Sequence, residues 1–533
     1  MKNICLNWTI SILTGLFALF FLTSAGYIFK ISVNPAYMPI SFLIFFFTLA
    51  FLTCKTEKKY FVKSILAQII VLFDFIILTG VLCCLIPDAS YDGITYHQAM
   101  IILLKLGLNP IYDNVSTFTN NQEYVFTSSI PYVENFLKFH ETIGANIYNI
   151  FGRIELTKIT NYIFMLCSLC YCVYTLRNFE LSEFKSWFWT FVLIYNPICV
   201  YQCLSNYVDG IFYYLFLILI FSLINFTKGF DCNKNLYLTC ISTVIFSNLK
   251  LTGLFTAVII ALVFLTLYRS KKVIVSFLIA TVLIIITGIN PYFTNIQKGR
   301  NAFYPVIQNS VLDANRDFMV TSYPQGFENK NRLEKFAFSI FAVSKNLSPL
   351  INSDDKPRLK IPFTISNDDK FIFEDMRLAG FGYFFSGILL GTLILSPFLR
   401  FNNKDDKKIF WTIISIIIIS VIGNHEAWWA RFVPQFWLLP VLILLFFNIN
   451  NQNSKKILIP VFTLAIICII NSSIINFQYF DDRIKQTFEY NNYVNNSPKI
   501  MYIPRSFPQQ NKLFETAPIK LQEYGIKVIY IDE

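Results

Sequence analysis

Charged residues are scarce in this sequence. They make up 14% of its 533 residues, whereas hydrophobic residues make up 55%, with 57 Phe among them. Such a chain carries more apolar surface than one soluble core can bury, so much of it has to face lipid. The short alternating strands of a membrane β-barrel are absent. Apolar runs long enough for a helix to cross the bilayer recur instead, and they predict an all-α polytopic membrane protein.

Cysteine is missing from the long polar stretches. The 12 Cys lie in or beside apolar runs, and the stretches without any Cys are residues 88–157, 291–377 and 476–533. No disulfide framework is indicated, and no Cys-x-x-Cys pair has the second pair that a zinc site requires. The three His, at 97, 140 and 425, match no metal-binding spacing. We therefore expect no cofactor, and a divalent metal remains an alternative that the sequence does not indicate.

The net charge of +11 is explained by topology. Its basic residues lie mostly in short connectors between apolar runs and form no single stripe, so nucleic acid is not an expected partner. Thirteen apolar segments are expected at about 6–27, 37–54, 64–86, 158–176, 187–203, 210–226, 236–248, 252–268, 273–290, 379–399, 409–423, 432–449 and 457–475. If the N-terminus is inside, every cytoplasmic connector is basic, as the positive-inside rule requires.

One pair of segments leaves an alternative open. Residues 236–248 and 252–268 form either two short helices that meet outside at Lys250 or one long kinked helix. A single helix would invert the second half of the chain and place its basic connectors outside, so two helices are preferred. The expected location is a bacterial cytoplasmic (inner) membrane, with the N-terminus inside and the C-terminus outside. The richness in Lys, Asn, Ile and Phe is typical of an AT-rich bacterial genome.

This topology predicts three domains. They are an N-terminal helical hairpin (1–63), a transmembrane domain (64–475) with extracytoplasmic loops at 87–157 and 291–378, and a C-terminal extracytoplasmic cap (476–533). In the first loop, residues 94–108 and 130–150 have helical periodicity and are expected on the membrane surface. In the cap, the runs 499–504 and 527–531 are strand-like and flank a helix end at 521–525, so a small α/β unit is expected.

The most informative polar stretch follows the third apolar segment. It contains Asp88, Asp92, Tyr96 and His97, which meet the low-dielectric boundary together. A carboxylate held there is a candidate general base toward a hydroxyl group. The alternative is an ordinary Asp-Gly turn that caps the next helix.

Three more polar clusters are expected at the same depth. They contain Asp209, Lys250 and the group His425, Glu426 and Arg431. Helix capping, snorkelling and interfacial anchoring explain each one separately. Ionisable residues at membrane depth are nevertheless costly and are functional candidates by default, and Lys and Arg there suit the phosphate of an amphiphile. Asp74, within the third segment, is expected to pair inside the bundle.

These residues resemble a known pattern. An acidic residue in Asp92-Gly-Ile-Thr-Tyr96 that opens the first large loop, Asp209, Lys250-Leu-Thr-Gly253 between two short helices, and Arg431-Phe-Val-Pro434 are similar to motifs of the GT-C glycosyltransferases. The nearest branch is that of protein O-mannosyltransferases and lipid A aminoarabinose transferases. The resemblance covers roughly residues 64–475. It implies a sugar transferred with inversion from a polyprenyl phosphate, with Asp92 as base and Lys250 and Arg431 at the carrier phosphate.

The sequence departs from this family in two places. The family often has a second acidic residue directly after the first, whereas Gly93 stands here, which leaves Asp88 as a rival base. Two helices also precede the one that leads to the catalytic loop. We therefore expect Asp92, Asp88 or Asp209 to be catalytic, and Tyr96, His97, Lys250, His425, Glu426 and Arg431 to bind substrate.

The expected function is that of a membrane glycosyltransferase. Its partners would be a polyprenyl-phosphate-linked sugar, membrane lipids and an extracytoplasmic glycan, lipid or protein acceptor. An O-antigen polymerase or ligase is an alternative, but it would be expected to carry paired Arg residues in its loops. A polysaccharide or lipid transporter predicts internal repeats and broken helices, and neither is visible in the sequence. A non-catalytic scaffold also remains open.

Overall fold

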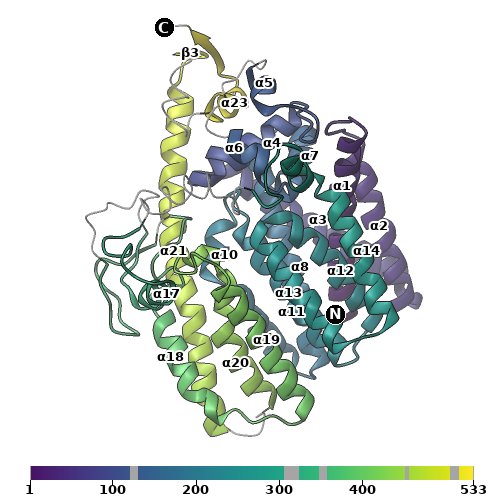
Figure 1. Ribbon diagram of the computed structural model, residues 1–533, viewed down its shortest axis with the longest axis vertical. Coiled ribbons are helices and arrows are strands. Elements are labelled where there is room, and N and C mark those ends of the chain that lie inside the picture. The colour runs from purple at the N-terminus through teal and green to yellow at the C-terminus, as the bar shows by residue number, and fades with distance from the viewer. Residues whose placement is uncertain are drawn as a thin grey trace.

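The computed structural model describes residues 2–120, 126, 130–304, 323–346, 357–371, 373–450, 455–504 and 515–531. The described chain is mostly helical, and its long helices pack side by side in one bundle (Figure 1). The N-terminal elements are α1 (Lys2–Ile28), α2 (Tyr37–Thr56), η1 (Lys58–Tyr60) and α3 (Phe61–Leu85). The first polar region contains η2 (Gly93–His97), α4 (Gln98–Lys105), α5 (Val115–Asn120), α6 (Ile130–Asn135), α7 (Phe139–Phe151) and η3 (Ile154–Lys158).

The rest of the chain continues the bundle. Its central helices are α8 (Ile159–Asn178), α9 (Glu183–Ile194), α10 (Pro197–Gln202), α11 (Asp209–Thr227), α12 (Cys232–Leu249), α13 (Leu251–Leu267) and α14 (Lys271–Thr287). The second polar region contains η4 (Ile289–Phe293), α15 (Thr294–Gln297), α17 (Arg332–Phe341), β1 (Lys345–Asn346) and β2 (Lys370–Phe371). The remaining elements are α18 (Phe385–Leu395), η5 (Ser396–Phe398), α19 (Lys404–Ile422), η6 (Ala430–Phe432), η7 (Pro434–Trp437), α20 (Leu438–Asn450), α21 (Lys455–Asn496), β3 (Ile500–Pro504), α23 (Ala517–Gln522) and β4 (Lys527–Ile531).

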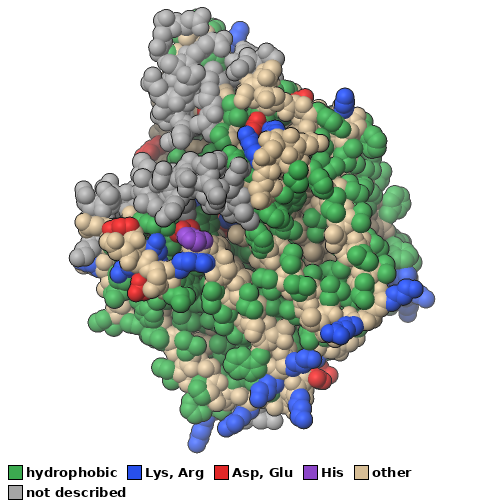
Figure 2. All heavy atoms as spheres, viewed as in Figure 1, with side chains coloured by type: hydrophobic (Ala, Val, Ile, Leu, Met, Phe, Trp, Pro, Cys, Tyr) green, Lys and Arg blue, Asp and Glu red, His purple; other side chains and the backbone are tan. Residues whose placement is uncertain are grey.

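The described helices fit a membrane. Six are long and apolar enough to cross one, or seven if α14 and the bent segment after it form one span. The six are residues 2–28, 37–56, 58–85, 154–178, 209–227 and 456–496. The expected class of helical membrane protein is therefore confirmed. Not all of the thirteen expected segments, however, form helices that are both long enough and apolar enough to cross a membrane. Figure 2 shows hydrophobic side chains over much of one face and Lys and Arg along its lower edge.

The centre of the bundle is α11. Every residue from Asp209 to Asn225 is buried, as expected for a helix that is apolar on all sides. The expected segment 187–203 is broken into α9 and α10, because Pro197 cannot continue α9 and instead starts α10. The side chain of Asn196 caps α10 by accepting a hydrogen bond of 3.1 Å from the backbone N–H of Ile198. This break is a correction to the single expected helix.

Two helices, α12 and α13, take the place of residues 236–268. Lys250 joins them in an extended conformation, with φ −156° and ψ 147°. The turn is tight enough that a Cβ at Gly253 would lie 2.2 Å from the carbonyl oxygen of Phe246. The single kinked helix was therefore the wrong alternative, and the preferred pair of helices is confirmed.

The polar regions differ from expectation in two respects. Residues 99–104 of α4 are all buried, so this helix is packed inside protein and does not lie on the membrane surface with one face in lipid. The last long helix, α21, does not end near residue 475 but continues to Asn496. Beyond it, β3 pairs in parallel with β4, from Ile500 opposite Lys527 to Pro504 opposite Ile531. With α23 between the strands, the expected small α/β unit is confirmed in the described part of the cap.

Candidate active site

Four of the predicted polar residues meet in one cluster. Arg431 Nη1 lies 2.7 Å from Asp92 Oδ2 and 3.7 Å from Asp209 Oδ2. Lys250 Nζ forms an ion pair with Asp209 Oδ1. The four side chains come from the start of η2, the start of α11, the α12–α13 turn and η6, which are far apart in the sequence. The structure thus brings together Asp92, Asp209, Lys250 and Arg431.

Local structure holds the Asp209 carboxylate in place. Gln202, at the end of α10, donates a 3.1 Å hydrogen bond from Nε2 to Asp209 Oδ2. Its Oε1 accepts a 2.8 Å hydrogen bond from the backbone N–H of Gly210. Asp209 is buried, and both of its oxygens contact a donor or a cation. A carboxylate that is occupied in this way orients the cations more readily than it accepts a substrate proton.

Asp375 is a fifth member of the cluster, and sequence reasoning missed it. Its Oδ1 lies 2.7 Å from Arg431 Nε and accepts a 2.8 Å hydrogen bond from Trp429 Nε1. Its Oδ2 accepts hydrogen bonds of 3.2 and 3.1 Å from Nε and Nη2 of Arg377. Backbone hydrogen bonds from Arg431 N to Met376 O and from Ala430 N to Arg377 O hold the two segments together. The sequence signal that could have pointed to Asp375 is the run of acidic and basic residues at 374–377, directly before an apolar segment.

The guanidinium of Arg431 is nearly enclosed. Only 8% of the residue is exposed, and the rings of Tyr207, Trp429 and Phe432 lie 4.8–5.4 Å from its central carbon. Burial lowers the pKa of Arg431, but Asp375 and Asp92 outweigh burial and hold the pKa well above its usual range. Arg431 therefore carries its charge throughout the physiological pH range. A guanidinium with fixed orientation suits a phosphate oxygen.

Asp92 and Asp88 have different surroundings. The Asp92 side chain is 15% exposed, accepts a 3.3 Å hydrogen bond from Tyr96 Oη and contacts Arg431 with the same oxygen. Asp88 is 3% exposed, and both of its oxygens are occupied. Oδ1 accepts from Ser90, and Oδ2 accepts from the backbone and side-chain nitrogens of Asn206 at 2.7 and 2.9 Å. Asp92 is thus the more accessible carboxylate, while Asp88 organises the turn.

The glycine after Asp92 has a steric explanation. A Cβ at Gly93 would lie 2.4 Å from Asp88 Oδ2 and 2.1 Å from Ser90 Oγ. The Asp88 carboxylate therefore occupies the space that a side chain at position 93 would need. An acidic residue directly after Asp92 is incompatible with this turn.

His97 lies behind the cluster. It is buried, and its Nδ1 contacts Glu141. Burial raises the pKa of Glu141, but the hydrogen bond with His97 and the charge interactions with the two histidines together outweigh burial, so the pKa lies below its usual value. Burial also lowers the pKa of the neighbouring His140 to about 4, so this imidazole is neutral at physiological pH. These contacts support η2 from inside the protein, and Tyr96 is the residue of this turn that contacts Asp92.

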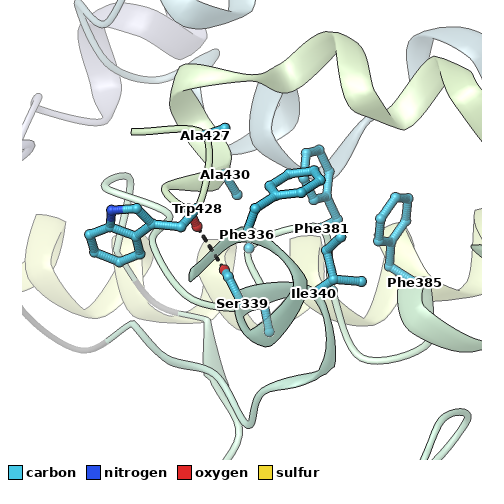
Figure 3. Close-up of a pocket in the computed structure, with 11 residues that line it drawn as sticks. Phe336, Ser339, Ile340, Phe381, Phe385, Ala427, Trp428 and Ala430 are labelled. Carbon is cyan, nitrogen blue, oxygen red and sulfur yellow. Dashed lines mark hydrogen bonds between the residues drawn. The ribbon is translucent and has the colours of Figure 1, made fainter. Parts of the chain in front are cut away.

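His425 and Glu426 form a separate group. His425 contacts Glu426, whose carboxylate also accepts hydrogen bonds from Tyr323 and Trp428. A pocket behind this segment is lined by apolar groups, and the hydroxyl of Ser339 donates to the Trp428 carbonyl across 2.7 Å (Figure 3). Its volume of about 10 Å³ is enough for one water molecule at most, so it is a small gap between packed side chains and not a substrate site.

The C-terminal cap anchors the turn that carries Asp92. Lys520 of α23 is buried, and its Nζ lies 2.6 Å from Glu155 Oε1 and 3.3 Å from the Asp88 carbonyl oxygen. Glu155 Oε2 in turn accepts a 2.8 Å hydrogen bond from the Asp88 N–H and pairs with Lys158. Burial lowers the pKa of Lys520, but Glu155 outweighs burial and raises it above its usual value. A charged Lys520 therefore ties α23 to residues 88–97.

Loss of this anchor should loosen the turn. We expect Lys520→Met to speed amide hydrogen exchange in residues 88–97 by about tenfold to a hundredfold, because a buried charge-assisted contact contributes about 1.5–3 kcal/mol. Lys527→Met is the matched control, since Lys527 lies in the same cap and is exposed. Hydrogen exchange followed by mass spectrometry measures both variants. Equal exchange in the two would show that α23 does not hold the turn.

Among the described residues, no group of three or more His, Cys, Asp or Glu side chains is placed to hold a metal ion. Comparison with models of protein families, with curated protein sequences and with solved structures finds no match.

Proposed function

We propose that this chain is an integral-membrane glycosyltransferase that moves a sugar from a polyprenyl-phosphate carrier to an extracytoplasmic acceptor. One observation carries the proposal. Asp92, Asp209, Lys250 and Arg431 were selected separately from the sequence, and they lie in one cluster of alternating charges. Chance clustering of ionisable groups at membrane depth is disfavoured by their desolvation cost.

The proposed reaction uses the cluster as follows. The oxygen of the acceptor hydroxyl attacks the anomeric carbon of the sugar while Asp92 takes the proton of that hydroxyl. The bond from the anomeric carbon to the phosphate oxygen breaks at the same time. The phosphate leaves with the electron pair and is stabilised by Lys250 and Arg431. Lys250 is the more accessible cation, with 25% of its side chain exposed, and Asp209 occupies only one of its three N–H groups. Asp209 and Asp375 hold the two cations in place.

A groove next to Lys250 suits the lipid part of such a carrier. It has a volume of about 190 Å³ and lies between α12, α13 and α14. Its lining is almost entirely apolar and includes Ser247 and Leu254, which lie within one helical turn of Lys250 on either side. A prenyl chain in this groove would bring its phosphate to the exposed part of the Lys250 side chain. This arrangement favours a lipid-linked donor over a soluble nucleotide sugar.

The proposed topology has thirteen crossings. Several connectors expected in the cytoplasm contact one another: Lys228 pairs with Asp406, Lys272 contacts Asn233, and the backbone of Asn402 contacts Asn450. The charged cluster joins the opposite ends of these helices. The shorter helix Leu251–Leu267 has 17 residues and a length of about 26 Å, close to the hydrocarbon thickness of about 30 Å.

The topology can be tested by labelling. In a background with the exposed and partly exposed native Cys replaced by Ser, Cys at Ser116 or Asn492 should react with a membrane-impermeant maleimide in intact spheroplasts. Cys at Lys58 or Asp405 should react only after the membrane is opened. All four positions are exposed, so access depends on the side of the membrane. Labelling of Asp405→Cys in intact spheroplasts would show that the number of crossings is wrong.

Transfer activity tests the function itself. The purified protein should transfer radiolabelled sugar from a polyprenyl-phosphate donor to a membrane or glycan fraction, and the same donor with a nucleotide in place of the lipid should not be used. Activity should be lost in Arg431→Ala and retained in Arg358→Ala, which removes an exposed Arg of the second polar region. Use of the nucleotide sugar alone would contradict the proposal.

A further inference from the structure

Asp74 lies near the middle of α3, a helix that is otherwise apolar through its central turns. It follows Lys63 by about 16 Å along the helix axis and precedes the polar turn at Asp88 by about 21 Å. In a hydrocarbon layer about 30 Å thick, this places the carboxyl near the bilayer centre. An Asp side chain is too short to reach either interface from there.

The bundle leaves this carboxyl uncovered. Asp74 is exposed, and no hydrogen bond or ion pair involves it among the described residues, so the expected pairing inside the bundle is wrong. The opposite side of α3 packs against α1 and α2. Gln68, for example, is buried and hydrogen-bonds Trp8 of α1 and Thr53 of α2.

Asp74 also lies at the centre of a continuous exposed stripe. Successive residues of an α-helix are 100° apart, so the positions that share its side are three, four or seven residues away. Those in the membrane are Ala67, Ile70, Val71, Ile77, Leu78 and Val81, and all are exposed. The carboxyl is thus placed where a neighbouring helix would contact it.

We propose that this side of α3 binds a membrane-spanning helix of a partner protein that carries a Lys or Arg at mid-membrane depth. A carboxylate at the bilayer centre is costly unless a cation or donor meets it, and charged residues at this depth almost always have such a partner. A second copy of this chain related by a two-fold axis would set Asp74 against Asp74, which supplies no cation. Charge complementarity therefore selects a basic partner helix. The inference does not depend on the proposed glycosyltransferase activity.

Co-reconstitution with a defined peptide tests this interaction. The probe is a Leu-Ala peptide of about 20 residues with one central Lys, and its control lacks the Lys. The full chain carries photoreactive benzoylphenylalanine at Leu78, on the Asp74 side, or at Ile285, an exposed position of α14. We expect crosslinking from Leu78 to favour the Lys peptide by roughly threefold to thirtyfold, with no preference at Ile285.

Substitution of Asp74 completes the test. Asp74→Leu should abolish the preference for the Lys peptide, and Asp74→Asn should reduce it. Both variants should keep the thermal melting temperature, because Asp74 is exposed and makes no hydrogen bond or ion pair with the part of the chain that the structure describes. Equal crosslinking of the two peptides, or a preference that survives Asp74→Leu, would overturn the proposal. Crosslinks between two copies of the chain at Leu78 that depend on Asp74 would overturn it too, in favour of self-association.

Discussion

Asp92→Asn should lower the turnover of sugar transfer by about 10² to 10⁴-fold, the usual contribution of a general base. Asn keeps the shape of the side chain and can still accept from Tyr96, so the turn should remain folded. The change removes basicity and the charge that faces Arg431. We therefore expect kcat to fall while the KM for the lipid donor changes little. Steady-state transfer rates over a range of donor concentrations measure both.

Asp88→Asn is the matched comparison. It alters a buried carboxylate whose two oxygens accept four hydrogen bonds. The NH₂ group of the new amide would replace one of these oxygens and would face the hydrogen-bond donors of Asn206 or Ser90. We expect a lower melting temperature and a turnover within about tenfold of the unmutated protein. If Asp88→Asn abolishes transfer and Asp92→Asn does not, the base has been assigned to the wrong residue. If neither matters, Asp209 is the next candidate.

The cluster could be predicted in part because charge is rare in this chain. Where only 14% of residues are charged, Asp92, Asp209, Lys250 and Arg431 at the ends of apolar runs are conspicuous. The positive-inside bias then placed all four on one side of the membrane. Their mutual contacts were not predictable, since they depend on the packing of α11 between its neighbours. His425 and Glu426 had the same sequence signal, yet the structure places them in a separate group.

The residues that sequence reasoning missed lie in long polar regions. Asp375 and Lys520 belong to segments with abundant charge, so neither stands out, and each acts through a contact distant in sequence. The burial of α4 was missed for a related reason. Periodicity reports that a helix has an apolar side, but it does not report whether protein or lipid covers that side. The extension of α21 past residue 475 was hidden because its outer half is polar on most sides.

Arg431→Ala should reduce kcat/KM for the lipid donor by more than a hundredfold. Two causes add: the carrier phosphate loses a charge-assisted contact of about 1.5–3 kcal/mol, and Asp92, Asp209 and Asp375 are left facing one another without the cation between them. Lys250→Ala removes only one contact, from a more exposed cation, so a tenfold to hundredfold rise in the donor KM is expected. Transfer rates at several donor concentrations distinguish the two variants.

Arg431→Lys separates binding of the phosphate from organisation of the cluster. A Lys ammonium restores the charge but cannot reach Asp92 and Asp375 with separate nitrogens, as the guanidinium does through Nη1 and Nε. We therefore expect the melting temperature of Arg431→Lys to lie closer to that of the unmutated protein than the melting temperature of Arg431→Ala does. The donor KM of Arg431→Lys should stay at least tenfold above that of the unmutated protein. Arg358→Ala, which removes an exposed Arg, should leave both quantities unchanged. Full recovery of donor use in Arg431→Lys would mean that charge alone suffices. An unchanged donor KM in Arg431→Ala and Lys250→Ala would make both residues structural anchors and would place the phosphate elsewhere.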